Sequence, residues 1–402
     1  MKNIYIIQNS NLSFDMDIEK IYSPNKYFLL LIVNPFSFKK LNTRRQENLF
    51  QKIWVIDDFN FDYLKELITH HQHNNPLPLQ IITNAEEAIT LCGQLRVFFN
   101  NETLNFDRFK NKLVMKEMLN KEKILTPKHI LFDKQLYQNQ PTVYVNHILE
   151  KLDFPFLVKP IDSMGCIGIE RISSVKELIN WCNAAILTQN QYEIDEFISG
   201  KVYNCDSFIK NNKIIFTQIS QCSNSCYDFI CGSTKGTIAL PPSDSLSKRL
   251  SAYTKKVHDA LKTPHAGVTH LEIILTNTNQ LYFIEIGYRS PGILIPAMYK
   301  KFLNIDTIES HILLQIDDDF NLKIEHKYYS AWIAFPTKNG KLIRKNTPVI
   351  QSHYKLDWTK KIGDQMSQPK CGRDYVGKAL LWNSNYLQLK NDFNYVNSFL
   401  IS

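Results

Sequence analysis

The sequence predicts a mixed α/β and α+β protein with more than one domain, on three observations. Its 402 residues exceed what one hydrophobic core normally organises, so two or three domains are expected. Apolar strand candidates alternate with helical patterns over the first hundred residues, which predicts a parallel sheet. Further along, strand candidates follow one another and include a hairpin, which predicts antiparallel pairing.

The N-terminal segment, residues 1–104, is expected to form the parallel α/β domain. Its strand candidates are apolar runs bounded by polar residues, and its helices carry apolar residues at helical spacing. The strands are expected at Ile4–Gln8, Tyr27–Val33, Lys52–Ile56 and Leu79–Thr83, and the helices at Asp62–His71 and Ala85–Phe98.

The middle segment, residues 105–325, begins with a charged helical stretch, FDRFKNKLVMKEMLNKEKIL, which Thr126-Pro127 ends. Six strands are then expected, and the polar turn TNTNQ joins the last two as a hairpin. The final segment, residues 326–402, is expected to be a small β-rich appendage with strands at Ser330–Pro336 and Gly340–Ile343. The six strands are Phe156–Lys159, Tyr192–Glu196, Tyr203–Ile209, Lys213–Ser220, Gly267–Leu275 and Leu281–Ile286.

Composition favours a soluble cytoplasmic protein. Hydrophobic residues make up 44% and charged residues 21%, close to globular averages. No apolar run reaches the ~18 residues of a membrane span, and the N-terminus lacks the pattern of a signal peptide. The net charge of +8 is not gathered into a basic block with aromatics, which argues against nucleic-acid binding.

Cysteine usage predicts free thiols in a reducing compartment. The eight cysteines are scattered along the chain, unlike a disulfide framework. Cys222, Cys226 and Cys231 form one cluster, but their spacing is looser than that of zinc sites and no fourth ligand is evident. A metal role for this cluster is therefore disfavoured.

A glycine-containing loop follows one predicted strand in FPFLVKPIDSMGCIGIERI. Lys159 ends the strand, and Ser163, Gly165 and Gly168 lie in the loop. The chain has only 13 glycines, so a pair of them suggests a backbone requirement. Glycines allow close backbone approach to a phosphate, whose oxygens successive amides can bind. An ordinary hairpin turn is the alternative.

Two carboxylates lie on adjacent apolar strands in GVTHLEIILTNTNQLYFIEIGYRSPG. Glu272 and Glu285 need cations or donors there, because burying an unpaired carboxylate is costly. Strand alternation puts His270 on the same face as Glu272. Such a pair suits Mg²⁺, which is usually bound by one or two carboxylates plus phosphates. The alternative is a structural salt bridge with Arg289.

In this order the motifs resemble the ATP-grasp family, and most closely its carboxylate–amine ligases, which include the L-amino-acid ligases. The resemblance covers residues 80 to 295 and rests on NAEEAITLCGQLRVFF, NKLVMKEML, ILTPKH, FPFLVKPIDSMGCIG, YEIDEFISG, HLEI and FIEIGYR. It implies a Rossmann-like pre-ATP-grasp domain (1–104), a two-lobed ATP-grasp domain (105–325, with the smaller ATP-covering lobe in 105–200) and a lid-like domain (326–402). Biotin-carboxylase-like and purine-biosynthetic carboxylating members share this scaffold.

The resemblance implies a role for each matching residue. Lys112 and Lys159 resemble the lysines that hold the ATP phosphates, and Ser163 to Gly168 the loop that covers them. Glu272 and Glu285 match the metal carboxylates, with Mg²⁺ as the expected ion and Mn²⁺ as an alternative. The remaining candidates are Arg289 and His270 as catalytic residues, Glu196, Phe197 and Ile198 as the hinge that contacts adenine, and Asp195 as a hinge acid or a member of a salt bridge.

Two positions depart from the family pattern: Gly287 stands where Asn is frequent, and Val202 where Glu often contacts the ribose. The expected reaction joins a small carboxylate to an amine through an acyl phosphate and releases ADP and phosphate. A carboxylating enzyme and a non-catalytic ATP-binding scaffold are the alternatives. No nucleic-acid or membrane partner is expected, and a homodimer is left open. The acceptor pocket is expected within Gln218–Pro242, whose residues do not identify the substrates.

Overall fold

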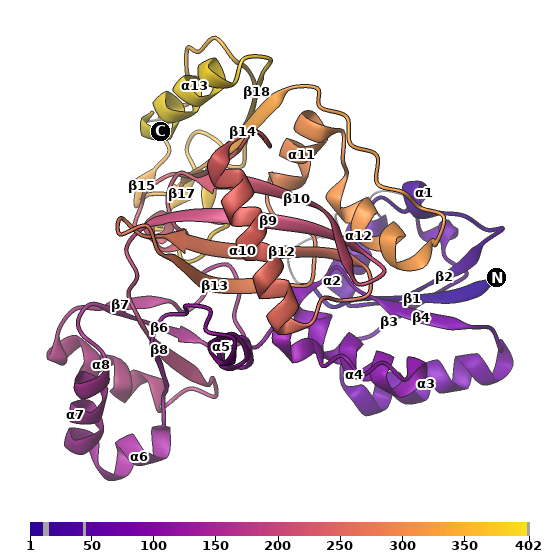
Figure 1. Ribbon diagram of the computed structural model, residues 1–402, viewed down its shortest axis with the longest axis horizontal. Helices are drawn as coiled ribbons and strands as arrows, with labels where there is room; N and C mark the ends of the chain where they lie inside the picture. The colour runs from indigo at the N-terminus through magenta and orange to yellow at the C-terminus, as the bar shows by residue number, and fades with distance from the viewer. Residues whose placement is uncertain (11–15, 43–45, 400–402) are drawn as a thin grey trace.

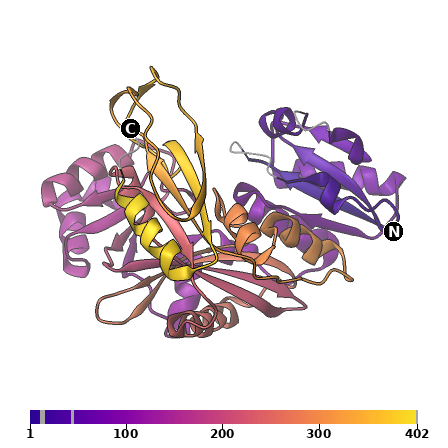
Figure 2. The same cartoon turned by 90° about the horizontal axis from the view of Figure 1, so that it is seen from above.

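The computed structural model describes residues 1–10, 16–42 and 46–399, which form four β-sheets with helices packed against them (Figure 1). A parallel N-terminal sheet and a four-stranded sheet within residues 129–196 lie at opposite ends of the molecule in both views (Figures 1 and 2). The large central sheet lies between them. Within the described ranges, no helix is both long and apolar enough to cross a membrane.

The N-terminal sheet is parallel, in the order β3-β2-β1-β4. Strand β1 packs Ile4 and Ile6 into one apolar cluster and Tyr5 and Ile7 into another. A strand covered on both faces must be apolar throughout, which explains the continuous apolar runs. The predicted strands and the helix at Asp62–His71 are confirmed with small shifts at their ends, whereas the start of the predicted helix Ala85–Phe98 is a 3-10 turn and the α-helix begins at Ile89. The strands are β1 (Lys2–Gln8), β2 (Tyr27–Val33), β3 (Lys52–Val55) and β4 (Leu79–Ile82). The helices are α1 (Ile18–Ile21), α2 (Pro35–Asn42), α3 (Phe61–Asn74) and α4 (Ile89–Asn100), with 3-10 turns η1 (Glu47–Leu49) and η2 (Glu86–Ala88).

The predicted long helix after residue 105 is wrong in one respect, because the chain breaks it into two pieces. A 3-10 turn, η3 (Phe106–Phe109), is followed by helix α5 (Lys112–Lys121). The side chain of Asn111 accepts hydrogen bonds from the amides of Leu113 and Val114. This cap satisfies amides that have no partner within the helix, and it fixes Lys112 at the first turn.

The four-stranded sheet that follows is antiparallel, in the order β5-β8-β6-β7. Three helices cover one face through a single apolar cluster that includes Phe156, Ile194 and Trp181. The strands are β5 (His129–Leu131), β6 (Phe156–Pro160), β7 (Glu170–Ile172) and β8 (Tyr192–Glu196). The helices are α6 (Lys134–Asn139), α7 (Pro141–Lys151) and α8 (Val175–Ala185).

The central sheet has eight antiparallel strands in the order β13-β12-β9-β10-β11-β14-β18-β16. Its first five strands are β9 (Lys201–Lys210), β10 (Lys213–Cys222), β11 (Lys235–Ala239), β12 (Gly267–Leu275) and β13 (Leu281–Gly287). The associated helices are α9 (Cys226–Ile230), α10 (Ser245–Leu261), α11 (Ile295–Leu303) and α12 (Thr307–Ile316).

The C-terminal segment is β-rich, as expected, but its longer strands continue the central sheet. Strand β14 pairs with β11, placing Trp332 opposite Thr237, and β18 and β16 follow. Nearly all of β14 is buried, as in an interior strand. The elements are β14 (Tyr329–Pro336), β16 (His353–Trp358), β18 (Tyr375–Asn383), helix α13 (Tyr386–Ser398), and the two-stranded pair β15 (Gly340–Lys341) and β17 (Gln365–Met366).

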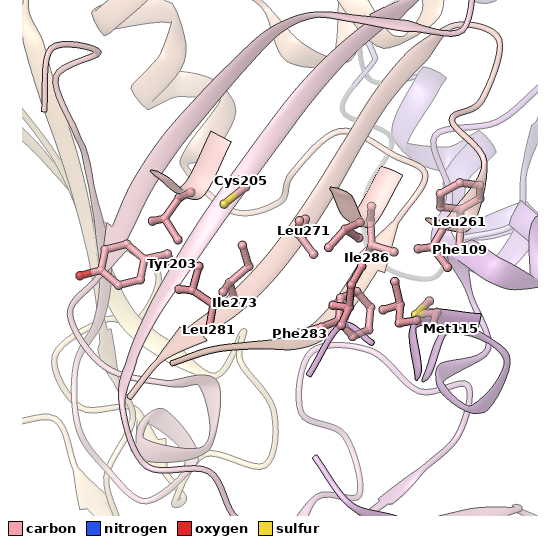
Figure 3. Packing of buried hydrophobic residues seen from close by; sticks show 14 of the residues in the cluster. Phe109, Met115, Tyr203, Cys205, Leu261, Leu271, Ile273, Leu281, Phe283 and Ile286 are labelled. Atoms are coloured by element: carbon pink, nitrogen blue, oxygen red, sulfur yellow. The ribbon is translucent and has the colours of Figure 1, made fainter. Parts of the chain in front are cut away.

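The two faces of β12 have different environments. Leu271 and Ile273 point into an apolar cluster that also contains Met115 of α5 and Leu261 of α10 (Figure 3). Because side chains alternate along a strand, the residues between them face the other way. The core on one face therefore orients the polar residues on the opposite face.

Candidate active site

A cavity of about 470 Å³ lies where the three large sheets meet. Its wall takes residues from the N-terminal segment, the four-stranded sheet, the loop after β6, the central sheet and the segment 371–373. Every predicted site residue lines this cavity except Gly168, which lies in the loop beside it. Residues widely separated in sequence are therefore gathered at one site.

Glu272 and Glu285 lie directly opposite each other on β12 and β13. A β-bulge follows this pair, because Ile273 is opposite Phe283 and leaves Ile284 without a partner. Phe283 is thus in the core, while Ile284 and Glu285 both line the cavity. The hairpin brings the two carboxylates to one point of the wall, as the sequence predicted.

His270 lies beside Glu272 and is hydrogen-bonded to the buried carboxylate of Asp206. Its Nδ1 is 2.6 Å from Oδ1 of Asp206, and its Nε2 is 3.6 Å from Oε1 of Glu272. Burial lowers the pKa of His270, but Asp206 outweighs burial and raises it to about 9. Burial likewise opposes ionisation of Glu272, but His270 and nearby cations bring its pKa to about 2. A charged imidazolium beside an ionised carboxylate is the result.

The two predicted lysines reach the cavity from different elements. Lys112 Nζ donates to the carbonyl of Ser163 at 2.8 Å and lies 3.3 Å from Oε2 of Glu285. Lys159 Nζ lies 2.7 Å from Oδ2 of Asp195 and 3.3 Å from Oε1 of Glu193. Burial alone would lower the pKa of Lys159, but these carboxylates outweigh it and raise the pKa well above its usual value.

Asp195 belongs to a buried salt-bridge network, which is the alternative that the sequence left open. Both of its oxygens lie 2.6 Å from Nζ of Lys116, a residue that sequence analysis missed. Lys116 also contacts Glu193 at 2.8 Å. Burial would raise the pKa of Asp195, but Lys116 and Lys159 keep it below its usual value. The network of two lysines and two acids fixes Lys159 at the cavity wall.

The loop after β6 contains three residues with positive φ: Gly165 (60°), Cys166 (65°) and Gly168 (73°). A Cβ at Gly168 would lie 3.0 Å from Cγ of Pro160, so both its conformation and its surroundings favour glycine. A Cβ at Gly165 would meet nothing within 4 Å. The carbonyl of Gly165 accepts a hydrogen bond of 2.9 Å from the amide of Gly372.

The segment Glu196–Ile198, predicted as the hinge, lines the cavity after β8. Glu196 is fixed by Lys128, since its amide donates to the Lys128 carbonyl at 2.8 Å and its Oε2 accepts from the Lys128 amide at 3.1 Å. The ring of Phe197 is 4.9 Å from the guanidinium of Arg171. Val202, at the position where the family often has Glu, also lines the cavity.

Arg289 pairs with Glu86, not with Glu272 or Glu285. Its Nε lies 2.6 Å from Oε2 of Glu86, in the N-terminal segment. Burial opposes ionisation of Glu86, but Arg289 and Lys110 together outweigh it and lower the pKa of that carboxyl. A Cβ at Gly287 would lie 3.5 Å from Cγ of Arg289. The Arg289 side chain therefore lies close to the space that an Asn would need there.

Lys235 of β11 is a cavity residue that sequence analysis did not name, although it lies in the expected acceptor region. Its Nζ is 2.8 Å from Sγ of Cys226. In the described ranges, no group of three or more His, Cys, Asp and Glu side chains could hold an ion. Two carboxylates alone still fit Mg²⁺, because phosphates and water complete its shell.

Part of the chain matches a known protein family. Residues 118–316 match the family described as D-ala D-ala ligase C-terminus. An L-arginine-specific L-amino acid ligase of Bacillus subtilis is 24% identical over 316 residues, which cover 74% of this chain and 72% of that protein.

Solved structures share the whole architecture. The crystal structure of an L-amino acid ligase from Bacillus licheniformis superposes with a TM-score of 0.71 and 16% identity, over 99% of this chain and 97% of that one. A second structure is the biotin carboxylase domain of a 2-oxoglutarate carboxylase from Hydrogenobacter thermophilus, a dimer with MgADP. It superposes with a TM-score of 0.60 and 13% identity, over 100% of this chain and 90% of that one. At these identities the likeness establishes the fold.

Proposed function

Since the chain is an ATP-grasp protein of the carboxylate–amine ligase class, we propose that its cavity activates a small carboxylate with ATP and transfers the acyl group to an amine. The observation that carries the proposal is the meeting of Lys112 and Lys159 with Glu272 and Glu285 in one cavity. Phosphoryl transfer is catalysed mainly by positioning and by charge neutralisation, and these groups supply both.

The nucleotide would lie between the four-stranded sheet and the central sheet. Lys112 and Lys159 would neutralise phosphate charge, and the loop Ser163–Gly168 would cover the phosphates with backbone amides. Its positive-φ residues support this role, because such loops form anion-binding concavities. The hinge Glu196–Ile198 would contact adenine. Asp195 would act indirectly, by holding Lys159 in place.

Glu272 and Glu285 would hold Mg²⁺, or Mn²⁺ in its place. Their direct opposition and their carboxylate oxygens fit a hard divalent cation. When bound, the ion would neutralise charge on the ATP phosphates. His270 would fix the rotamer of Glu272 through their 3.6 Å contact. Arg289 would stabilise the negative charge of the acyl phosphate.

The proposed reaction has two displacements. A carboxylate oxygen of the first substrate attacks the γ-phosphorus, and the bond from that phosphorus to the β–γ bridging oxygen breaks, releasing ADP. The amine nitrogen of the second substrate then attacks the acyl carbon. The carbon–oxygen bond to phosphate breaks, and the nitrogen loses a proton. No side-chain nucleophile takes part.

The domain layout belongs to the same proposal: residues 1–104 as the pre-ATP-grasp domain, 105–325 as the ATP-grasp domain and 326–402 as a lid-like part. The hydrogen bond from Gly372 to Gly165 supports a covering role for the last segment. The eight free cysteines support a reducing compartment such as the cytoplasm. The proposal also includes a homodimer.

A coupled screen for phosphate release tests the function. Pairs of amino acids and other small carboxylates and amines are supplied with MgATP, and ADP, AMP and coupled product are measured. We expect ADP formation to require a carboxylate and to accelerate with a competent amine. Turnover with bicarbonate and no amine would assign the carboxylating reaction instead. ATP binding without turnover across the screen would favour a scaffold.

A further inference from the structure

Three segments far apart in sequence meet at a pair of thiols in the cavity. Cys166 lies in the loop between Gly165 and Gly168, and Cys226 begins helix α9. Their side chains are close enough to influence each other, and both line the cavity. The third segment is 371–373. It packs against Cys226, as shown by the 3.2 Å that would separate a Cβ at Gly372 from Sγ of Cys226, and that Cβ would also touch the carbonyl of Gly165 next to Cys166.

The two thiols differ in character. Cys226 is half-buried and its Sγ is 2.8 Å from Nζ of Lys235, whereas Cys166 is buried. The neighbouring Cys166 thiol lowers the pKa of Cys226, burial opposes this, and Lys235 adds to the lowering, which brings the pKa to about 7. The neighbouring Cys226 and burial raise the pKa of Cys166. A thiolate beside a lysine, with a second thiol close by, is the usual environment of a reactive cysteine and its resolving partner.

We propose that Cys226 and Cys166 form an oxidation site inside the cavity, where a peroxide-class oxidant links the loop after β6 to α9 by a reversible disulfide. No step of the proposed ligase reaction uses either thiol. The effect on turnover rests on the proposed function, but formation of the disulfide does not.

The oxidation is balanced in two steps. The Cys226 thiolate attacks one oxygen of hydrogen peroxide, the O–O bond breaks, and a sulfenic acid and water form after one proton is taken up. The sulfur of Cys166, losing its proton, then attacks the sulfenic sulfur and expels a second water. Two electrons pass from the two sulfurs to peroxide. A dithiol reductant reverses the change by thiol–disulfide exchange.

The link would tie the proposed phosphate-covering loop to the central sheet. Cys166 lies directly after Gly165, whose carbonyl is already held by Gly372. The disulfide would remove the freedom of this loop to open and admit nucleotide. We therefore expect oxidised protein to bind ATP and turn it over at least about tenfold less well, since gating loops control access to such sites.

The experiment treats the reduced full-length protein with stoichiometric hydrogen peroxide, blocks free thiols with iodoacetamide and maps the peptides by mass spectrometry. ATP binding and turnover are measured before oxidation, after it, and after dithiothreitol. Cys231→Ser is the matched control, because Cys231 is exposed, close in sequence and outside the cavity lining. Cys166→Ser and Cys226→Ser are compared by the ratio of oxidised to reduced activity within each variant.

We expect a peptide pair linked through Cys166 and Cys226, and a loss of ATP binding that dithiothreitol restores in the wild type and in Cys231→Ser. Neither single variant at the pair should show the dithiothreitol-reversible loss. Recovery of both peptides alkylated, or linkage of Cys226 to Cys371 instead, would overturn the proposal, as would a Cys166–Cys226 link that leaves ATP binding unchanged. If the protein has no ligase turnover, the peptide map and the ATP-binding ratio still decide the matter.

Discussion

Glu272 and Glu285 face each other across the β12–β13 hairpin, and the bulge at Ile284 follows directly on this pair. The apolar cluster on the far face of the sheet fixes the hairpin, since Leu271, Phe283 and Ile286 are all buried there. The geometry of the two carboxylates is therefore set by core packing that takes no part in the chemistry.

The first prediction concerns this carboxylate pair. Glu285→Gln keeps the size of the side chain and removes its charge, so it should slow turnover at least about a hundredfold, which corresponds to roughly 3 kcal/mol of lost stabilisation. Steady-state ADP release measures the effect, and circular dichroism checks the fold. Glu325→Gln, in an exposed segment, serves as the control. Full activity in folded Glu285→Gln would rule out the metal assignment.

The second prediction concerns the buried network around Asp195. Asp195→Asn leaves Lys116 and Lys159 with one buried acid between them, which should lower the free energy of unfolding by about 3–5 kcal/mol. It should also weaken ATP binding, because Lys159 is no longer fixed. Urea unfolding and ATP titration measure the two effects.

Asp259→Asn is the matched control, because Asp259 pairs with Lys255 on the exposed face of α10 at 2.6 Å. An exposed pair of this kind contributes less than about 1 kcal/mol. Equal effects of the two substitutions would show that the Asp195 network does not stabilise the fold.

Much of the fold could be predicted from local patterns. Strand β2 was predicted with the observed bounds because a strand buried on both faces has an unbroken apolar sequence. The Glu272–Glu285 hairpin was predicted because its turn and its alternation are local. The motif order then predicted that distant residues share one cavity.

What could not be predicted depends on contacts between distant segments. Strand β14 shows an apolar run but not its partner, so its place in the central sheet beside β11 was missed. Glu86 lies 203 residues from Arg289, and nothing in NAEEA indicates that pairing. Lys116 looks like an exposed helical lysine in sequence and is fully buried in the structure. The pair Cys166 and Cys226 likewise joins a loop to the start of helix α9 without a shared motif.

The third prediction concerns the glycine loop. Gly168→Val adds a side chain where a Cβ would already lie 3.0 Å from Pro160 and φ is 73°. The loop should be displaced, and ATP binding or turnover should fall by more than for Gly165→Ala, where the space is open. Loss of the whole fold, with ATP affinity kept in the remaining folded fraction, would make the loop structural only.

The fourth prediction concerns acid stability. The imidazole of His311 bridges two segments: its Nδ1 accepts from the amide of Val268 at 2.9 Å, and its Nε2 donates to the carbonyl of Thr83 at 2.9 Å. Burial lowers the pKa of His311 to about 4. The unfolded chain therefore takes up this proton first, near pH 6.5. Stability should be complete above about pH 6.5 and fall by roughly 3 kcal/mol as the pH drops to 4.

His311→Gln should make this decline shallower, because an amide does not titrate. His265→Gln is the control, since His265 is exposed. The measurement is the slope of the unfolding free energy against pH between 6.5 and 4. The same slope in His311→Gln and wild type would contradict the assignment of His311 as the titrating group.

The most direct test of the central claim follows oxygen from the carboxylate substrate into phosphate. If the carboxylate is activated by phosphorylation, one of its oxygens bridges carbon and phosphorus in the intermediate and leaves with phosphate when the amine attacks. With a carboxylate labelled with ¹⁸O and a competent amine, we predict one labelled oxygen in the released phosphate, and ADP without AMP. Coupled product formed with no label in phosphate would contradict the acyl-phosphate route.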